Sequence, residues 1–183
     1  MLEPNFTPFP KLMTERLLLR QINQKDAAEI FFLRSDGTIL QYLSKEPAQS
    51  LKEAEEFITR ITNDLSTGDG IAWGIALKKD PEKIIGTIGY WRMQKENYRA
   101  EIGYVLHPNY WRQGIMKEAI LKVLDYGYHT MGLHSVEARI NPYNKASSSV
   151  LEATGFVKEG YFRQDYFFRE QFEDTAVYSR LNV

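Results

Sequence analysis

The sequence of 183 residues contains no cysteine. This absence excludes disulfide bonds, thiolate metal sites and a cysteine nucleophile. It also fits a reducing compartment, so we expect a cytoplasmic protein. The chemistry must come from other side chains or from the backbone, and we expect no metal ion to take part.

Two further absences narrow the class of protein. No apolar run approaches the roughly 20 residues that a bilayer-spanning helix needs, and residues 1–10 lack the basic start and apolar block of a signal peptide. Basic residues show no surplus, because the formal net charge is -1. We therefore expect neither a membrane protein nor a direct binder of nucleic acid.

What the sequence does contain is the composition of a folded domain. Aromatic residues make up 13% of the chain and the charges nearly balance, whereas disordered chains combine low hydrophobicity with high net charge. The length suits one domain with a sizeable core. We predict an extended, proline-containing arm over residues 1–11 and a single domain over residues 12–183.

Strand and helix signals follow one another along the chain. Capping-box spacing predicts helix starts at Asp26 and Ser50, and Asp80-Pro81 predicts a turn. Two more helices are predicted over residues 115–131 and between residues 144 and 155. Short apolar runs predict strands over residues 16–22, 71–77, 84–92, 98–106, 135–140, 156–163 and 172–181.

This order predicts a mixed α/β fold. The connections between strands 71–77, 84–92 and 98–106 are too short for crossovers, so these strands should form an antiparallel meander. A helix separates strand 98–106 from strand 135–140, which favours parallel pairing of those two. We expect one central twisted mixed sheet of about seven strands, with about four helices.

The segment HPNYWRQGIMKEAI (residues 107–120) places Gly114 where a turn meets a helix. Arg112 and Lys117 flank this junction, and no Ser, Thr, Asp or Asn is positioned as a cap. A helix start offers free N–H groups and partial positive charge, and glycine lets an anion approach the backbone closely. The segment predicts a phosphate or pyrophosphate cradle, and the alternative is a solvated helix start with ordinary surface charges.

Three segments resemble one family of enzymes. "TERLLLRQINQKDA", "AEIGYVLHPNYWRQGIMKEAI" and "NPYNKASSSVLEATGF" are similar to the GNAT N-acetyltransferases, and within them to the RimJ/RimL-type ribosomal-protein N-terminal acetyltransferases. The resemblance covers Leu12 to Leu181. It implies the GNAT fold, with acetyl-coenzyme A in a V-shaped opening between the fourth and fifth strands, 98–106 and 135–140.

The resemblance also implies cofactor-binding residues. The family's pyrophosphate loop, Q/R-x-x-G-x-G/A, falls on residues 111–116, where Gly114 matches and Trp111 and Met116 depart from the pattern. These departures shift the expected binding to backbone N–H groups. Asn144 corresponds to a contact of the pantetheine arm and Asn141 is expected to hold the splayed backbone, with a helix cap and a turn as local alternatives. The implied loop contacts are Arg112, Gln113, Gly114, Ile115, Met116 and Lys117.

The implied reaction is direct attack of an amine on the acetyl thioester, which needs an oxyanion donor and a proton for the leaving thiolate. The resemblance places the oxyanion donor at a backbone N–H of Val105 or Leu106, at a strand bulge. The tyrosine that many members use as the acid would fall on Leu151 and is absent. Ser147 is nominated instead as the acid or thiolate hydrogen-bond donor, and a small packing residue is the alternative.

Glu101 is the candidate base. It lies in strand 98–106, and burial in the cleft would raise its pKa. Binding a cationic acceptor and a place on the outer face of the sheet are the alternatives. An α-amine has an ordinary pKa of roughly 7.7–8.0, so water can suffice as the base for such an acceptor.

Three hypotheses for function follow from the motifs. The first is an N-acetyltransferase for a protein N-terminal α-amine, and the second has a small amine such as a polyamine, amino acid or antibiotic as acceptor. The third is a catalytically degenerate acyl-coenzyme A-binding module. Acceptor selection is expected from the loop 36–49 and the hairpin tip near Arg169–Gln171. The aromatic segment YFRQDYFFRE is expected to pack on the sheet, with an acceptor cover or a homodimer contact as alternatives.

Overall fold

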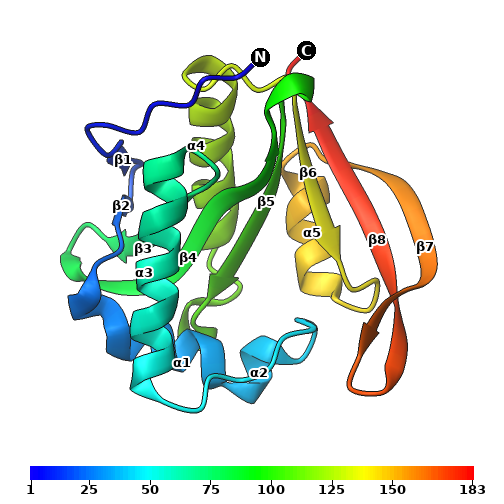
Figure 1. Cartoon of the computed structure of the whole chain (residues 1–183), viewed down its shortest axis with the longest axis horizontal. Coiled ribbons are helices and arrows are strands. Elements are labelled where there is room, and N and C mark those ends of the chain that lie inside the picture. Colours follow the sequence, from blue (N-terminus) through cyan, green and yellow to red (C-terminus); the bar gives the residue numbers. More distant parts are fainter.

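One mixed sheet runs through the computed structural model, which describes residues 1–183 (Figure 1). Its eight strands lie in the order β1-β2-β3-β4-β5-β6-β8-β7, and only β5 and β6 pair in parallel. The predicted meander, the single parallel pair and the mixed α/β class are confirmed. The strands are β1 (Leu12–Met13), β2 (Leu17–Gln21), β3 (Ile71–Leu77), β4 (Asp80–Gln94), β5 (Arg99–Leu106), β6 (Ser135–Ile140), β7 (Val157–Phe168) and β8 (Gln171–Leu181).

Helices cover both faces of the sheet. In Figure 1, α1 and α3 lie in front of it, whereas α4 and α5 lie behind. The one-turn helix α2 adds to the four helices expected from the sequence, and no helix is long and apolar enough to cross a membrane. The α-helices are α1 (Ala27–Ser35), α2 (Gly37–Leu40), α3 (Leu51–Thr67), α4 (Ile115–His129) and α5 (Lys145–Ala153), and the 3-10 helices are η1 (Gln24–Asp26), η2 (Lys95–Asn97) and η3 (Pro108–Tyr110).

The larger apolar cluster fills the space between the sheet and α4. Trp73 and Tyr90 are fully buried there, and the Tyr90 hydroxyl donates to the backbone oxygen of Val123 at 2.9 Å. A Cβ atom on Gly127 would lie 2.5 Å from that hydroxyl oxygen. Gly127 is therefore what lets α4 pack closely on β4. Leu2 of the predicted arm is buried in the same cluster, and the division into arm and domain stays a prediction.

Two local features differ from the sequence-based expectation. Asp26 does not cap α1; its carboxylate accepts from the backbone N–H of Asn23 at 2.9 Å and from Arg20, so the capping box begins at Asn23. The buried ion pair with Arg20 explains the shift, because it fixes the Asp26 side chain one turn before the expected position. The turn after β3 uses Lys78 and Lys79, and β4 already begins at Asp80, before Pro81.

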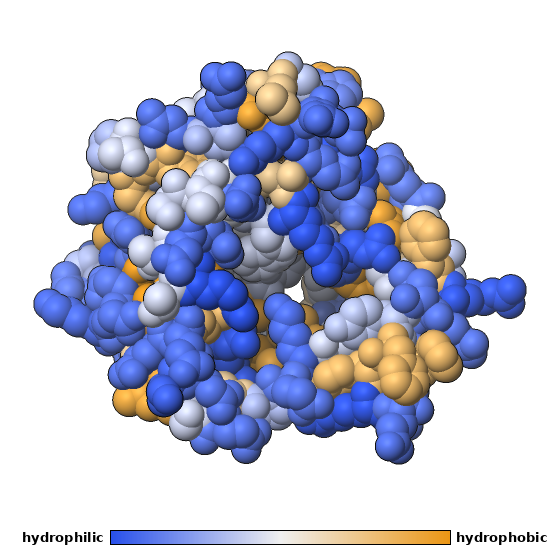
Figure 2. Space-filling view, viewed as in Figure 1, coloured by the Kyte–Doolittle hydropathy of each residue, from blue (hydrophilic) through white to orange (hydrophobic).

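The aromatic segment YFRQDYFFRE of the β7–β8 hairpin is exposed, so the expectation that it packs on the sheet is wrong. β7 is an edge strand, and almost all of its residues are solvent-exposed. Figure 2 shows apolar side chains gathered at the lower right, where the tip of this hairpin lies in Figure 1. The exposed aromatic residues of the hairpin are Tyr161, Phe162, Tyr166, Phe167 and Phe172.

The feature that positions the site is the separation of β5 from β6. Their parallel pairing runs from Arg99↔Ser135 only to Glu101↔Glu137. Beyond that point β5 stays with β4 as far as Leu106, whereas β6 follows β8 as far as Ile140. The two strands diverge in a V toward their carboxyl ends (Figure 1), and the region between them is called the opening below.

Candidate active site

The segment between β5 and α4 carries a row of unused backbone donors. Gly114 is the N-cap of α4, adopts a positive φ of 74° and forms no side-chain cap hydrogen bond. Arg112 also has a positive φ of 58°. None of the N–H groups from Arg112 to Lys117 donates to another group of the chain. Consecutive free N–H groups beside a helix start form a concave anion site; the uncapped start is confirmed, and its ligand stays a prediction.

The turn between β1 and β2 holds this segment in place. Glu118, in the first turn of α4, accepts from the guanidinium Nε of Arg16 at 2.7 Å, from the Arg16 backbone N–H at 3.0 Å and from the Thr14 hydroxyl. The Arg16 guanidinium also donates to the backbone oxygen of Gln113 at 2.9 Å. Partial burial opposes ionisation of Glu118, but these donors outweigh it and lower its pKa. The sequence carries no signal for this clamp, because Arg16 and Glu118 lie 102 residues apart.

Trp111, which departs from the family pattern, ties the segment to β5. Its indole N–H donates to the backbone oxygen of Leu106 at 2.7 Å. The bulge expected at Val105 and Leu106 is absent, since β4 and β5 keep one register from Gly86↔Leu106 to Trp91↔Glu101. Because His107 donates its N–H to Ile85 on β4, alternation along the strand turns the Val105 N–H toward β4 and the Leu106 N–H toward the opening.

The two asparagines after β6 are both used locally. The side-chain oxygen of Asn141 accepts from the backbone N–H of Tyr143 at 2.9 Å, and that of Asn144 accepts from the N–H of Ser147 at 3.0 Å. Both local alternatives, the turn and the helix cap, are therefore present. Neither amide NH2 group donates within the chain, and an amide offers donors independently of its oxygen, so these donors are left for a ligand.

Ser147 is buried and has a partner that the sequence did not suggest. Its hydroxyl lies 2.8 Å from the hydroxyl of Tyr104 on β5, so the pair bridges the opening between β5 and α5. Burial raises the pKa of Tyr104, against the opposing effect of its hydrogen bond to Ser147. The phenol therefore keeps its proton at neutral pH. No tyrosine follows Asn144 on α5 at the family spacing. Tyr104 instead reaches α5 from β5, on the opposite side of the opening.

Glu101 lies where β5 and β6 begin to part. Its carboxylate is 16% exposed and accepts from Arg92 at 3.0 Å. Burial raises the pKa of Glu101, and the positive charge of Arg92 limits that rise. The alternative of an outward-facing surface residue is excluded by this burial. Whether Glu101 moves a proton or binds a cationic acceptor depends on the ligand.

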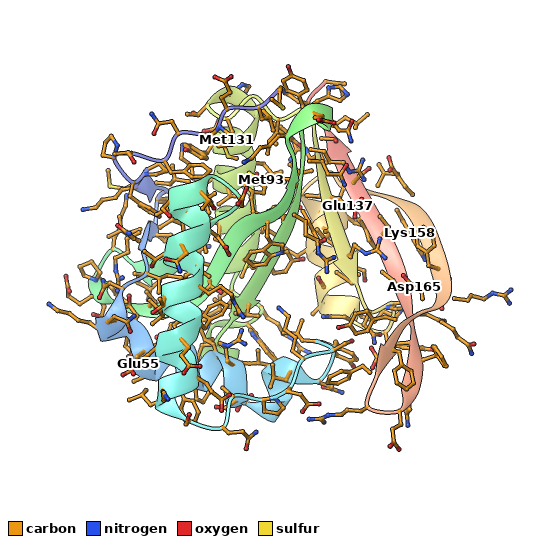
Figure 3. The ribbon with its side chains drawn as sticks, viewed as in Figure 1. Glu55, Met93, Met131, Glu137, Lys158 and Asp165 are labelled. Atoms are coloured by element: carbon orange, nitrogen blue, oxygen red, sulfur yellow. The ribbon has the colours of Figure 1, made fainter.

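A second carboxylate stands beside it. Glu137 is the register partner of Glu101 on β6 and forms ion pairs with Arg99 and Arg139. Arg139 also binds Asp165 of β7 at 2.8 Å; Figure 3 labels Glu137 and Asp165. No group of three or more His, Cys, Asp or Glu side chains is arranged to hold a metal ion. The wall of the opening is thus a network of paired charges.

A cavity of about 370 Å³ lies next to Asn141, the residue that follows β6. The segment after α1, Asn141 and the tip of the β7–β8 hairpin line it, which brings together the two acceptor loops expected from the sequence. Figure 2 shows a hollow near the middle of this face, rimmed by hydrophilic side chains. The charged lining residues are Lys45, Arg169 and Glu173.

Comparison with known proteins identifies the class. Residues 16–157 match the family described as the acetyltransferase (GNAT) domain. This match covers more than half of the chain. The chain therefore belongs to the GNAT family and is an N-acetyltransferase, an enzyme of the acyltransferase class.

Individual relatives agree on the class but not on the acceptor. The chain is 39% identical over 171 residues to the uncharacterized N-acetyltransferase YoaA of Bacillus subtilis, covering 93% of this chain and 96% of YoaA. It is 24% identical to the ribosomal protein uS5-alanine N-acetyltransferase of Escherichia coli, covering 93% and 90%. It is also 24% identical to the spermidine N(1)-acetyltransferase of Vibrio cholerae, covering 89% and 91%. Identity does not choose between these two acceptors.

A solved structure shares the fold. The ribosomal L7/L12 α-N-protein acetyltransferase RimL, in complex with coenzyme A, superposes with a TM-score of 0.85 at 19% identity, covering 94% of this chain and 98% of RimL. The likeness to the RimJ/RimL branch is confirmed at the level of fold and sequence relatives. Solved neighbours of this fold bind coenzyme A or acetyl-coenzyme A.

Proposed function

We propose that the enzyme transfers an acetyl group from acetyl-coenzyme A to the α-amine at a protein N-terminus, by direct attack in a ternary complex. One observation carries the proposal: a single opening has six unused backbone donors at one end and a largely buried carboxylate, Glu101, on its wall. The first feature suits a diphosphate, and the second suits an amine.

The residues present fit this substrate. Acetyl-coenzyme A supplies the acetyl thioester and a diphosphate that needs hydrogen-bond donors. The backbone N–H groups of Arg112, Gln113, Gly114, Ile115, Met116 and Lys117 would hold the diphosphate, with the Arg112 and Lys117 side chains adding attraction at longer range. The free amide groups of Asn141 and Asn144 would donate to carbonyl groups of the pantetheine arm.

The backbone of β5 would stabilise the developing oxyanion. Between the two residues expected for this role, strand alternation favours the Leu106 N–H, which faces the opening, over the Val105 N–H, which faces β4. The Trp111 indole already satisfies the Leu106 backbone oxygen. This bond and the pairing of Leu106 with Gly86 of β4 hold the end of β5 in place before any ligand binds, as an oxyanion donor requires.

Ser147 would donate to the leaving thiolate, and Tyr104 would assist it. In this role Tyr104 is a positioning residue, because it acts on the thiolate through the Ser147 hydroxyl. Its proton is retained at neutral pH, so the Tyr104 hydroxyl can donate to Ser147 while the Ser147 hydroxyl donates onward. This arrangement would replace the single tyrosine acid that the family spacing puts at Leu151.

Glu101 would accept the amine proton, directly or through water. Its ion pair with Arg92 limits how basic it becomes. A weak base suits an α-amine, with an ordinary pKa of roughly 7.7–8.0, better than an alkyl amine near 10.4. This difference in basicity, together with the RimJ/RimL-type motifs, favours the protein N-terminus over a polyamine.

The test is thiol release from acetyl-coenzyme A with a panel of N-terminal peptides, amino acids and polyamines. We expect turnover on peptides, and Glu101→Gln should lower kcat about tenfold or more while leaving the Kd for acetyl-coenzyme A within about twofold. The acid limb of the pH–rate profile should lie above the ordinary pKa of Glu, because burial raises the pKa of Glu101, and this limb should vanish in the variant.

Three results would count against the proposal or a part of it. Turnover confined to polyamines would replace the protein N-terminus by a small amine. Tight binding of acetyl-coenzyme A without turnover on any acceptor would favour a binding module. An unchanged kcat in Glu101→Gln would remove Glu101 from the reaction.

A further inference from the structure

The acceptor cavity is lined by a lysine that forms no ion pair within the chain. Lys45 lines the cavity, and its ammonium group makes no ion pair or hydrogen bond within the chain. Lys45 is exposed to solvent. The protein atoms packed around it lower its pKa, and the positive charges of Arg34 and Arg60 lower it further.

These two arginines are themselves without a carboxylate partner. The Arg34 guanidinium stacks on the Phe57 ring at 4.1 Å and the Arg60 guanidinium lies 5.2 Å from the same ring. The Nε of Arg34 is buried and has no hydrogen-bond partner. Burial and the charge of Arg60 lower the pKa of Arg34, and Glu53 offsets this effect only at a distance. A buried donor left unsatisfied is costly and calls for a partner.

Four other arginines on the acceptor side of the opening form ion pairs. Arg92 binds Glu101, Arg99 binds Glu137, Arg139 binds Asp165, and Arg169 binds Glu46. Glu173 is the remaining carboxylate of the cavity lining, and its oxygen accepts from the Ser44 hydroxyl. Arg34 and Arg60 form no ion pair of their own, and both act repulsively on the Lys45 ammonium group. Like charges that converge without counter-charges repel each other unless a ligand supplies an anion.

We infer that the acceptor carries an anionic group, a carboxylate or a phosphate, a few bonds from its reactive amine, and that this group binds at Lys45. This inference rests on the proposed function, since it names the substrate class of the same site. Glu101 attracts Lys45 across the opening. The acceptor site therefore has a negative group for the amine, Glu101, and a positive group for the anion, Lys45. A polyamine carries positive charge along its whole length, so Lys45 would repel it.

Two sources supply this chemistry: an acidic side chain near a peptide N-terminus, and the α-carboxylate of a free amino acid. Initial rates should be measured with three peptides that differ only at the second residue, Ala-Asp, Ala-Asn and Ala-Lys. Alanine and alaninamide form the amino-acid arm, and spermidine is the polyamine arm. We expect kcat/KM for Ala-Asp to exceed that for Ala-Lys by about tenfold or more, mostly through KM.

Substitution of Lys45 shows whether this residue sets the preference. Lys45→Met keeps most of the side-chain length and removes the charge, so the ratio of Ala-Asp to Ala-Lys should fall toward one. Lys45→Glu should reverse the ratio. Lys25→Met removes an exposed lysine of η1 outside the cavity, and it should keep the wild-type ratio.

The outcomes separate this inference from the function on which it rests. Peptide turnover with equal rates for the three peptides, or a ratio unchanged in Lys45→Met, would overturn the anionic acceptor and leave peptide acetylation standing. Turnover of alanine but not of alaninamide or any peptide would support the anionic group and overturn the protein N-terminus. Spermidine as the best acceptor would overturn both.

Discussion

The two walls of the opening recognise their ligands by different means. The wall at the start of α4 offers consecutive backbone N–H groups from Arg112 to Lys117 and one left-handed glycine. The wall below β5 and β6 offers side-chain charges that only the fold brings together. They come from α1, from α3, from β5 and from the segment before α3. One wall is local in sequence, and the other is assembled from distant parts.

This difference matches the two ligands that the enzyme is proposed to bind. Acetyl-coenzyme A is the same molecule across the family, and backbone donors can hold its phosphates whatever the neighbouring side chains are. Acceptors differ between relatives, which include a spermidine and a ribosomal-protein acetyltransferase at equal identity. Side chains that change singly can alter acceptor choice without disturbing the cofactor wall. Substitutions in one wall should therefore leave the other wall's measurement unchanged.

The largest effect is expected at Gly114. Gly114→Asp places a negative charge against the phosphates and a side chain at a φ of 74°, which disfavours L-residues. We expect the Kd for acetyl-coenzyme A, measured by calorimetry, to rise about 100-fold or more. Gly114→Ala separates strain from charge. Its Cβ would lie 3.5 Å from the Arg16 guanidinium, an ordinary contact, so only about a fivefold loss from backbone strain is expected.

The matched control adds the same charge on the other wall. Gly37 lines the acceptor cavity and has open space around an added Cβ. Gly37→Asp should leave the Kd for acetyl-coenzyme A within about twofold. If Gly114→Asp also stays within a few-fold of the wild type, the phosphates do not bind at the start of α4.

A smaller effect is expected where the two walls meet, at the pair of Tyr104 and Ser147. Ser147→Ala and Tyr104→Phe should each lower kcat by about tenfold, with the Kd for acetyl-coenzyme A nearly unchanged. The double variant should be little worse than either single one, because both act through one hydroxyl chain. Ser148→Ala is the control, since the Ser148 hydroxyl is exposed and donates to the Lys145 backbone oxygen.

A merely structural role for the pair would show differently. Loss of packing would raise the Kd and lower the melting temperature together, with kcat unaffected once the substrates are saturating. Additive losses in the double variant would mean that Tyr104 acts independently of Ser147.

The fold could be predicted because its signals are local. The Ser50 cap is confirmed, with its hydroxyl accepting from Glu53 N–H at 3.4 Å, and β3 and β6 begin and end at the expected residues. The features that were missed depend on tertiary contacts. The two-residue strand β1 has no periodicity to read, and Asp26 leaves the expected cap because Arg20 pairs with it.

The same limit separates the two walls. The uncapped junction at Gly114 can be recognised from six consecutive residues, Arg112 to Lys117, which include both flanking positive charges. The Tyr104–Ser147 pair spans 43 residues, and the convergence of Arg34 and Arg60 on Lys45 needs α1 and α3 to be packed side by side. Sequence spacing carries no signal for such contacts. The bulge expected at Val105 is absent for a related reason. The opening does not need a bulge in β5, because it arises where β6 leaves β5 and follows β8.

The smallest effect is expected from the clamp that supports the cofactor wall. Folding lowers the pKa of Glu118, because donors from Thr14 and Arg16 outweigh partial burial. The stabilisation is therefore present above the unfolded pKa of roughly 4.3 and is lost as the pH falls through the lower folded value. Glu118→Gln should lower stability by about 1 kcal/mol at pH 7, or about 2–4 °C in Tm, and the difference should close in strong acid. Glu56→Gln, which breaks an exposed pair with Lys52, should have almost no effect on stability.

The Kd for acetyl-coenzyme A should rise only a few-fold in Glu118→Gln, while the preference between Ala-Asp and Ala-Lys peptides stays at its wild-type value. A changed peptide preference would show that the two walls are coupled through α4 and would break the separation between them.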